Sequence, residues 1–184
     1  AALCLSRPHM PFKGLIMAIL ISPMIVPLII TAAGMFFFYA RINLVYTFTG
    51  VILAHVALAT PFVVITVTAT LVGFDMNMVK ASQSLGARPV KTFFRVIMPL
   101  ILPGIISGAL FAFITSFDEV VIVMFMASLD QLTIPKQMWA GIRQEISPVI
   151  LCMATCLVAL SIFLLTTVEL LRRRSERLRG IKAR

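Results

Sequence analysis

The strongest candidates for binding a charged ligand in this chain are two adjacent acids, Asp118 and Glu119. They directly follow a long uncharged run and are the only acids near the interior of such a run. A carboxylate at membrane depth is costly, so it usually faces a helix-bundle interior or an aqueous path, where it would attract a polycation. The alternative is that the helix ends at Phe117 and that both acids are solvated or cap the next segment. Neighbouring side chains on a helix point in different directions, so the two acids cannot both face one path.

Other residue types that often carry chemistry are few. His55 lies within a second uncharged run, where hydrogen bonding to a neighbouring helix is the more common role. Cys152 and Cys156 are one helical turn apart with no other metal-type ligand beside them, so they are interpreted as packing residues. The sequence contains no G-x-x-x-x-G-K-[ST] phosphate loop, nucleophile elbow or dinucleotide-binding glycine pattern. It therefore predicts no enzyme activity, no metal and no cofactor, and any energy must come from another subunit or an ion gradient.

The elements that position these residues are predicted to be long apolar helices. Of the 184 residues, 60% are hydrophobic and only 12% are charged, whereas a soluble domain has roughly a quarter charged residues. This excludes a water-soluble enzyme or a nucleic-acid-binding domain. A helix needs about 20 apolar residues to cross a bilayer. Uncharged runs of at least this length cover residues 14–40, 42–74, 96–117 and 146–168.

The predicted fold class is thus all-α integral membrane, a polytopic helix bundle with about four full spans. Residues 1–171 would form the transmembrane domain and 172–184 a basic cytoplasmic tail. Pro23 and Pro27 in the first run, and Pro61 in the second, predict bends in the spans, either for packing alone or to widen a central cavity.

The basic residues predict the orientation in the membrane. Most of the 16 Lys and Arg residues lie before residue 14, within 75–95, or after residue 171. Because basic residues favour the cytoplasmic side, both chain ends and the 75–95 loop are placed there. This topology explains the net charge of +9 without a nucleic-acid partner. The apolar stretch Ala1–Leu5 precedes the first basic residue, unlike a signal peptide, and is interpreted as the end of an earlier span in an N-terminally truncated chain.

The 75–95 loop is predicted to form two short helices. Asp75 suits the N-cap of a helix over 76–85, and Gly86 suits the left-handed position just past its end. Pro89 suits the first turn of a second helix that runs to Arg95. Isolated short helices are marginal in water, so a partner should hold this pair on the cytoplasmic face. The membrane spans on either side argue against a DNA-binding helix-turn-helix.

At this loop the sequence resembles a known family. Lys80-Ala81-Ser82, Gly86 and Val96-x-Met98-Pro99 have the spacing of the EAA loop, E-A-A-x3-G-x9-I-x-L-P, of the membrane subunits of ABC importers. Lys80 stands where the motif has Glu, and Ser82 where it has the second Ala. The resemblance implies that this loop is the coupling helix, which docks on a cytoplasmic ATPase. The coupling residues that it implies are Lys80, Ala81, Ser82, Leu85, Gly86, Ala87 and Pro99.

The resemblance extends over almost the whole chain. Segments that look like the PotC/YdcV-type permeases of spermidine/putrescine importers are Ile21–Pro27, Ala59–Val64, Ser116–Val120 and Gln137–Arg143. This family implies the type I ABC importer (MetI-like) fold, multi-pass in a bacterial inner membrane. The partners that it implies are a cytoplasmic ABC ATPase dimer, a second permease subunit and a periplasmic substrate-binding protein, besides the lipid bilayer.

The external segment 130–148 contains Trp139 and Arg143 in an amphipathic pattern. Trp at the headgroup level would make this segment an interfacial helix. In the family that the chain resembles, the same segment lies where the binding protein docks. The two roles are compatible.

The resulting prediction is a permease subunit of an ATP-driven polyamine importer. One alternative is an importer of the same architecture for another solute, such as an anion, although acids along the path disfavour anions. A second is a multispan scaffold that transports nothing. A third is a gradient-driven carrier, which would need inverted repeats that are not evident in the sequence.

Overall fold

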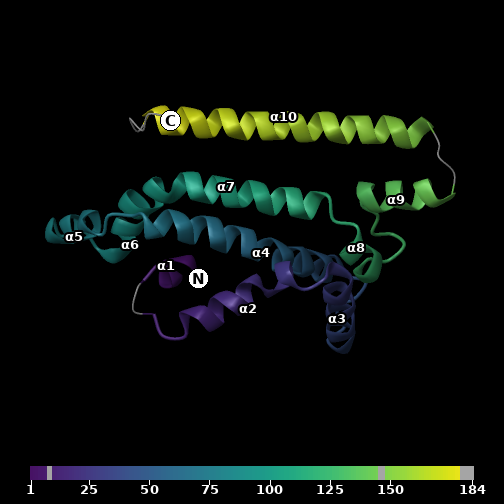
Figure 1. The fold of residues 1–184 in the computed structure, drawn as a ribbon, viewed down its shortest axis with the longest axis horizontal. Helices are drawn as coiled ribbons and strands as arrows, with labels where there is room; N and C mark the ends of the chain where they lie inside the picture. Colours follow the sequence, from purple (N-terminus) through teal and green to yellow (C-terminus); the bar gives the residue numbers. More distant parts are fainter. Residues whose placement is uncertain (8–9, 145–147, 179–184) are drawn as a thin grey trace.

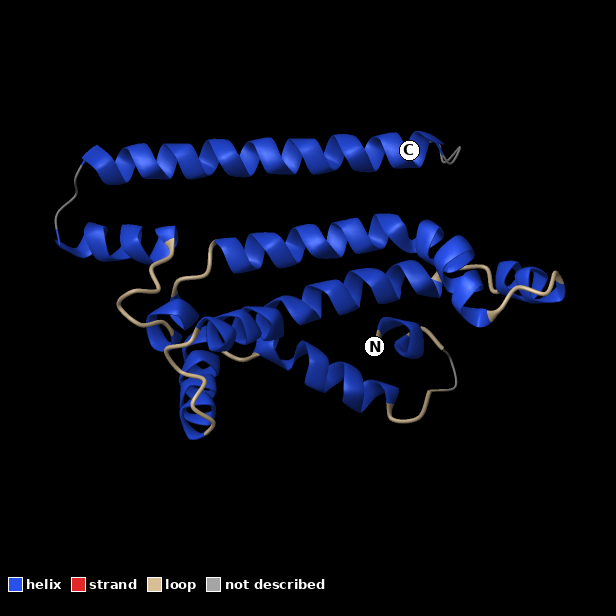
Figure 2. Ribbon diagram, turned by 180° about the vertical axis from the view of Figure 1, so that it is seen from behind, coloured by secondary structure: helices blue, strands red, loops and turns tan. Residues whose placement is uncertain are grey.

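The computed structural model describes all residues except 8–9, 145–147 and 179–184. Every regular element in this described part is a helix (Figure 2), which confirms the predicted all-α class. Three helical segments are long and apolar enough to cross a membrane: Phe48–Val72, Pro89–Phe117 and Pro148–Thr167. A bent helix pair, Lys13–Ile25 with Leu28–Arg41, makes a fourth span if it is counted as one.

The helices follow one another in a simple order. In sequence they are α1 (Ala2–Leu5), α2 (Lys13–Ile25), α3 (Leu28–Arg41), α4 (Phe48–Val72), α5 (Asn77–Ser84), α6 (Pro89–Thr92), a π-helical turn (Phe93–Ile97), α7 (Met98–Phe117), α8 (Val121–Met126), α9 (Ile134–Gln144) and α10 (Pro148–Leu178). The predicted basic tail 172–184 begins within α10, and its last residues, 179–184, lie outside the described residues.

The first predicted span is not one straight helix. The helices α2 and α3 form a bend of 106°, and α3 points away from the rest of the bundle (Figure 1). Pro27 lacks an amide hydrogen, and its ring pushes the preceding residue out of the helical region. Val26 is accordingly extended, with φ −72° and ψ 136°. Pro23 lies inside α2 and Pro61 inside α4 without ending either helix, so only one of the three predicted bends is a complete break.

The helices α4 and α7 lie side by side at the centre of the fold (Figures 1 and 2). Gly104 and Gly108 of α7 face α4, with the four-residue spacing of small residues that allows membrane helices to approach closely. A Cβ at Gly108 would lie 3.1 Å from the Cα of Val63, and a Cβ at Gly104 would collide with the side chain of Thr70. The absence of side chains at these two positions therefore permits the close contact of the two helices.

A second contact region joins α3, α4 and α8. The buried residues at its core are Ala32, Ala54, Leu58, Ile122 and Met126. It lies at the end of the bundle opposite to α5 and α6 (Figure 1), and it fixes the short helix α8 directly after the two acids that the sequence singled out.

The last helix, α10, runs alongside α7 and contacts α7 and α9 (Figure 1). Much of its apolar surface is exposed: Leu151 is 63% exposed and Phe163 66%. Apolar side chains in such number are suited to lipid rather than water. Cys152 and Cys156 are free thiols exposed on this helix, and their interpretation as packing residues stays a prediction.

Candidate functional site

The loop between α4 and α7 has most of the geometry that the sequence predicts. The helix α5 begins at Asn77 with Met76 as its N-cap, so Asp75 lies one residue before the predicted N-cap position. Its Oδ1 still accepts a hydrogen bond from the Asn77 amide at 2.9 Å, which satisfies a donor of the first helical turn. Gly86 has φ +77°, the left-handed conformation that favours glycine after a helix. Pro89 is the first residue of α6.

The second short helix of the prediction does not end at Arg95. It continues through the π-helical turn Phe93–Ile97 into α7, so that Pro89–Phe117 is a single helical segment. Pro99 has no amide hydrogen to donate to the carbonyl four residues earlier, and the widened turn before it accommodates that gap. The loop therefore contains one separate short helix, α5, and the second helix, α6, is the beginning of a spanning helix.

A hydrogen bond between two hydroxyls fixes α5 to this extension. Ser82 Oγ lies 3.0 Å from Thr92 Oγ1, and Thr92 is only 2% exposed. Sequence reasoning missed Thr92, because nothing in the spacing of the two residues indicates that they meet. The other predicted coupling residues are not drawn into a cluster: Lys80, Ala81, Leu85, Gly86 and Pro99 are exposed, and Ala87 is half-buried.

The loop and the two acids lie at opposite ends of the molecule. The helices α5 and α6 project at one end of the α4–α7 pair, and α8 and α9 lie at the other (Figure 1). The predicted cytoplasmic residues are thus separated from the predicted external residues by the length of the spanning helices.

Asp118 and Glu119 have different environments. The helix α7 ends at Phe117, as the alternative interpretation of the two acids required. Glu119 is 6% exposed, and its Oε1 accepts a hydrogen bond from the Ile122 amide at 2.8 Å, so this carboxylate caps α8. Glu119 lies beyond the end of α7, and its burial raises the pKa of the carboxyl, while hydrogen bonds from the backbone of Ile122 and Val121 oppose that rise.

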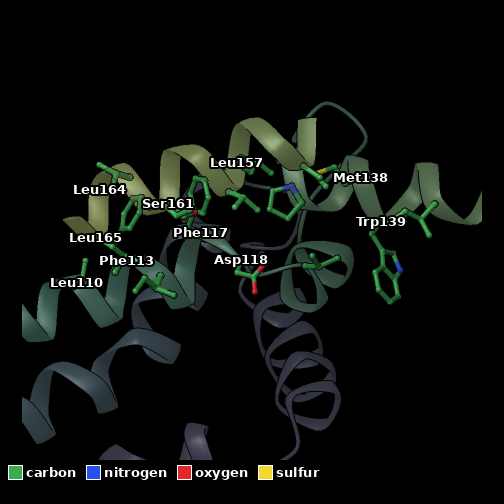
Figure 3. A pocket seen from close by; sticks show the side chains of 17 residues that line it. Leu110, Phe113, Phe117, Asp118, Met138, Trp139, Leu157, Ser161, Leu164 and Leu165 are labelled. Atoms are coloured by element: carbon green, nitrogen blue, oxygen red, sulfur yellow. The ribbon is translucent and has the colours of Figure 1, made fainter. Parts of the chain in front are cut away.

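Asp118, in contrast, is exposed and lines a cavity of about 520 Å³ between α7, α9 and α10 (Figure 3). It is the only charged residue among those that line this cavity, and the rest of the wall is mainly apolar. Phe113 and Phe117 of α7 and Trp139 of α9 contribute aromatic rings. A carboxylate in an apolar, aromatic wall can bind a cation that carries methylene groups.

Trp139 and Arg143, which the sequence grouped as an external pair, do lie together. The Arg143 guanidinium is 5.4 Å from the centroid of the Trp139 ring, within the range of a cation–π contact. Trp139 is 45% exposed and also borders the cavity of Asp118, a proximity that their separation in sequence did not indicate.

His55 forms the predicted contact with a neighbouring helix. Its Nδ1 lies 2.7 Å from Ser116 Oγ, which joins α4 to α7. The other ring nitrogen, Nε2, is buried without a hydrogen-bond partner in the described chain. Ser116 was not identified from the sequence as the partner of this residue. Within the described residues, no group of three or more His, Cys, Asp or Glu could hold a metal ion.

Comparison with known proteins places these features in a family. The model of the family described as "Binding-protein-dependent transport system inner membrane component" matches residues 1–177. The spermidine/putrescine transport system permease protein PotC of Haemophilus influenzae is 29% identical over 175 residues, which cover 95% of this chain and 68% of PotC. PotC of Escherichia coli K12 is 27% identical over 172 residues, which cover 94% of this chain and 65% of the relative.

A third relative is the putrescine transport system permease protein PotI of Escherichia coli K12, 37% identical over 103 residues that cover 56% of this chain. The chain spans about two thirds of the length of the two PotC relatives. Because the family match covers nearly all residues, the chain belongs to the family of binding-protein-dependent transport system inner membrane components.

Proposed function

We propose that this chain is a permease subunit of an ATP-driven importer of polyamines such as spermidine and putrescine. The observation that carries the proposal is the family match over residues 1–177, together with relatives that are named for spermidine and putrescine transport. The protein would lie in a bacterial inner membrane with both ends in the cytoplasm, because the basic residues concentrate on that side.

The proposed coupling element is the loop around Gly86. It carries a short helix whose exposed side has no partner in the described chain, and it projects at one end of the spanning helices (Figure 1). The Ser82–Thr92 hydrogen bond and the left-handed Gly86 hold this helix at a fixed angle. Such a rigid projection is suited to transmit movement between a cytoplasmic ATPase and the membrane helices.

The proposed cargo contact is Asp118. A polyamine is a chain of methylene groups that joins ammonium groups, so it needs carboxylates or aromatic faces for its charges and apolar surface for its stem. The cavity of Asp118 offers each of these. Trp139, which borders this cavity, and Arg143, which lies over its ring, are proposed as the contact for a substrate-binding protein or as an interfacial anchor. Glu119 is not proposed for the path, because its carboxylate caps α8.

The first test is isolation of the full-length permease from its membranes in mild detergent, with partners identified by mass spectrometry. An ATP-binding subunit and a second multispan protein should be recovered together. Recovery of neither, at good yield, would favour a scaffold or a gradient-driven carrier.

The second test is uptake of radiolabelled putrescine by the complete complex in proteoliposomes loaded with ATP. Spermidine should compete and sulfate should not; competition by sulfate alone would indicate an anion importer of the same architecture. Asp118→Asn should raise the KM for putrescine. Asp130→Asn is the matched control, because Asp130 is an exposed acid of the same external region that does not line the cavity.

A further inference from the structure

The outward side of α5 is centred on one lysine. Successive residues of an α-helix are rotated by about 100°, so Lys80 lies nearly opposite Ser82 on the helix. Ser82 Oγ is hydrogen bonded to Thr92 Oγ1 at 3.0 Å, which turns the Ser82 side toward the extension of α7. Lys80 is therefore on the side that faces away from the protein, and it is exposed.

The residues around Lys80 on this outward side carry no charge. Met76, Asn77, Gln83 and Ser84 lie within about 60° of Lys80 on the helix, and all four are exposed. The Ser84 hydroxyl is committed to the Lys80 carbonyl at 3.0 Å. The Lys80 ammonium is the only charged group in α5, so it dominates the electrostatics of this surface.

The loop itself supplies no ion-pair partner for Lys80 in the described chain. Its one acid, Asp75, lies just before α5 and accepts a hydrogen bond from the Asn77 amide. In the described part of the chain Lys80 forms no ion pair, and neither do the three other basic residues of the loop, Arg88, Lys91 and Arg95. An unpaired positive surface of this kind is complementary to an acidic partner.

We infer that Lys80 selects the ATPase that this permease binds, through a carboxylate that the docking groove of that ATPase presents opposite the ammonium. The inference rests on the proposed coupling function and adds the chemistry of the partner. An ATPase whose groove carries a basic residue at this point, as would suit a loop with Glu in place of Lys80, is excluded by repulsion between like charges.

A protein groove fits this surface better than a lipid headgroup layer does. A helix that lies in a membrane interface turns its apolar side to the acyl chains. The outward side of α5 has Lys80 at its centre with Asn77 and Ser84 beside it, and Met76 is the only apolar residue of the group. This arrangement suits one specific ion pair in a shallow contact.

The test uses the complete complex of full-length permease, second permease and ATPase in proteoliposomes, with complex yield and ATP-dependent uptake as readouts. Lys80→Glu should lower ATP-coupled uptake about tenfold or more, since it juxtaposes like charges at an interface. Lys80→Arg should retain uptake. The matched control is Arg41→Glu, the same change of charge at an exposed residue at the end of α3, and it should leave uptake unchanged.

Suppressor selection then identifies the partner group. Restored uptake of the Lys80→Glu complex should come from ATPase mutations that replace a groove carboxylate with Lys or Arg. Undiminished uptake by Lys80→Glu would overturn the inference while leaving the importer assignment intact. So would a defect that disappears in vesicles of phosphatidylcholine alone, because the contact would then be with anionic lipid. A wild-type complex that contains no ATPase would instead refute the proposed function itself.

Discussion

Substitution of Gly86 tests whether the proposed coupling of the loop to an ATPase depends on its backbone conformation. Gly86 has φ +77°, and a Cβ placed there would meet no atom of the described chain within 4 Å. The cost of a side chain is therefore conformational rather than steric. For an L-residue the left-handed conformation costs about 1–2 kcal/mol, which reduces the population of the native loop by a factor of roughly 5–30 relative to other loop conformations.

A graded series separates this conformational cost from side-chain size. Asn adopts the left-handed conformation more readily than Ala, and a β-branched residue adopts it least. Gly86→Asn should therefore retain most coupling, Gly86→Ala should lose a substantial part, and Gly86→Val should lose nearly all. The matched control is Gly73→Ala at the end of α4, where φ is −83° and the nearest contact of a Cβ is the Thr70 carbonyl oxygen at 4.0 Å.

The assay is the ratio of putrescine taken up to ATP hydrolysed by the complete complex, with membrane insertion measured as the yield of folded permease. Insertion should be the same for all variants, because Gly86 lies outside the spanning helices. Wild-type coupling in the Gly86→Val complex would refute the role of this conformation. Equal defects for Asn and Val would show that side-chain volume at a docking contact, and not the φ angle, is what matters.

Substitutions at three further positions test contacts that stabilise the helices. Gly108→Val should weaken the α4–α7 pair by about 1–3 kcal/mol, because its Cβ would lie 3.1 Å from the Val63 Cα; unfolding of the permease in mixed micelles measures this. Ser116→Ala removes the partner of His55 Nδ1. It should destabilise the protein by about 0.6 kcal/mol, which is typical of a hydrogen bond between membrane helices. The same unfolding assay measures this, and no change would mean that water replaces the hydroxyl. Glu119→Ala should lower the free energy of unfolding by about 1 kcal/mol, because α8 loses its capping carboxylate. Glu119→Gln should retain most of this stability, because its amide oxygen can still accept the hydrogen bond from the Ile122 amide. Equal effects of the two variants would contradict the capping role.

The loop between α4 and α7 could be predicted because its signals are local. Asp75, Gly86 and Pro89 each act on the backbone of their nearest neighbours, through a capping acceptor, a positive φ and a fixed φ. Gly86 and Pro89 are in the expected positions, and Asp75 accepts a hydrogen bond from the Asn77 amide from one residue before the N-cap. The apolar runs likewise indicate spans whatever their packing, since hydropathy is a property of each helix alone.

The pairings between distant residues could not be predicted in this way. Ser82 meets Thr92, and His55 meets Ser116, only because helices far apart in sequence lie side by side. The assignment of Asp118 and Glu119 to different roles depends on where α7 ends, and the sequence allowed either outcome. Helix ends are set by tertiary contacts as well as by local sequence, and here the buried helix α8 requires an acceptor at its start.

The two prolines of the first span have different effects on the helix. Because proline has no amide hydrogen, the carbonyl four residues before it loses its hydrogen-bond donor. For Pro23 this is the carbonyl of Ile19, which accepts a hydrogen bond from the Ser22 hydroxyl at 2.8 Å, and α2 continues through the proline. A hydroxyl beside a proline is one of the ways in which membrane helices satisfy a freed carbonyl. Pro27 is preceded by Val26, which has no donor to offer, and there the helix breaks and the chain turns by 106°. In the first span a hydroxyl beside the proline thus accompanies the continuous helix. The helix α7 also continues through Pro103, which follows Leu102, so the residue before a proline does not by itself decide whether a helix ends.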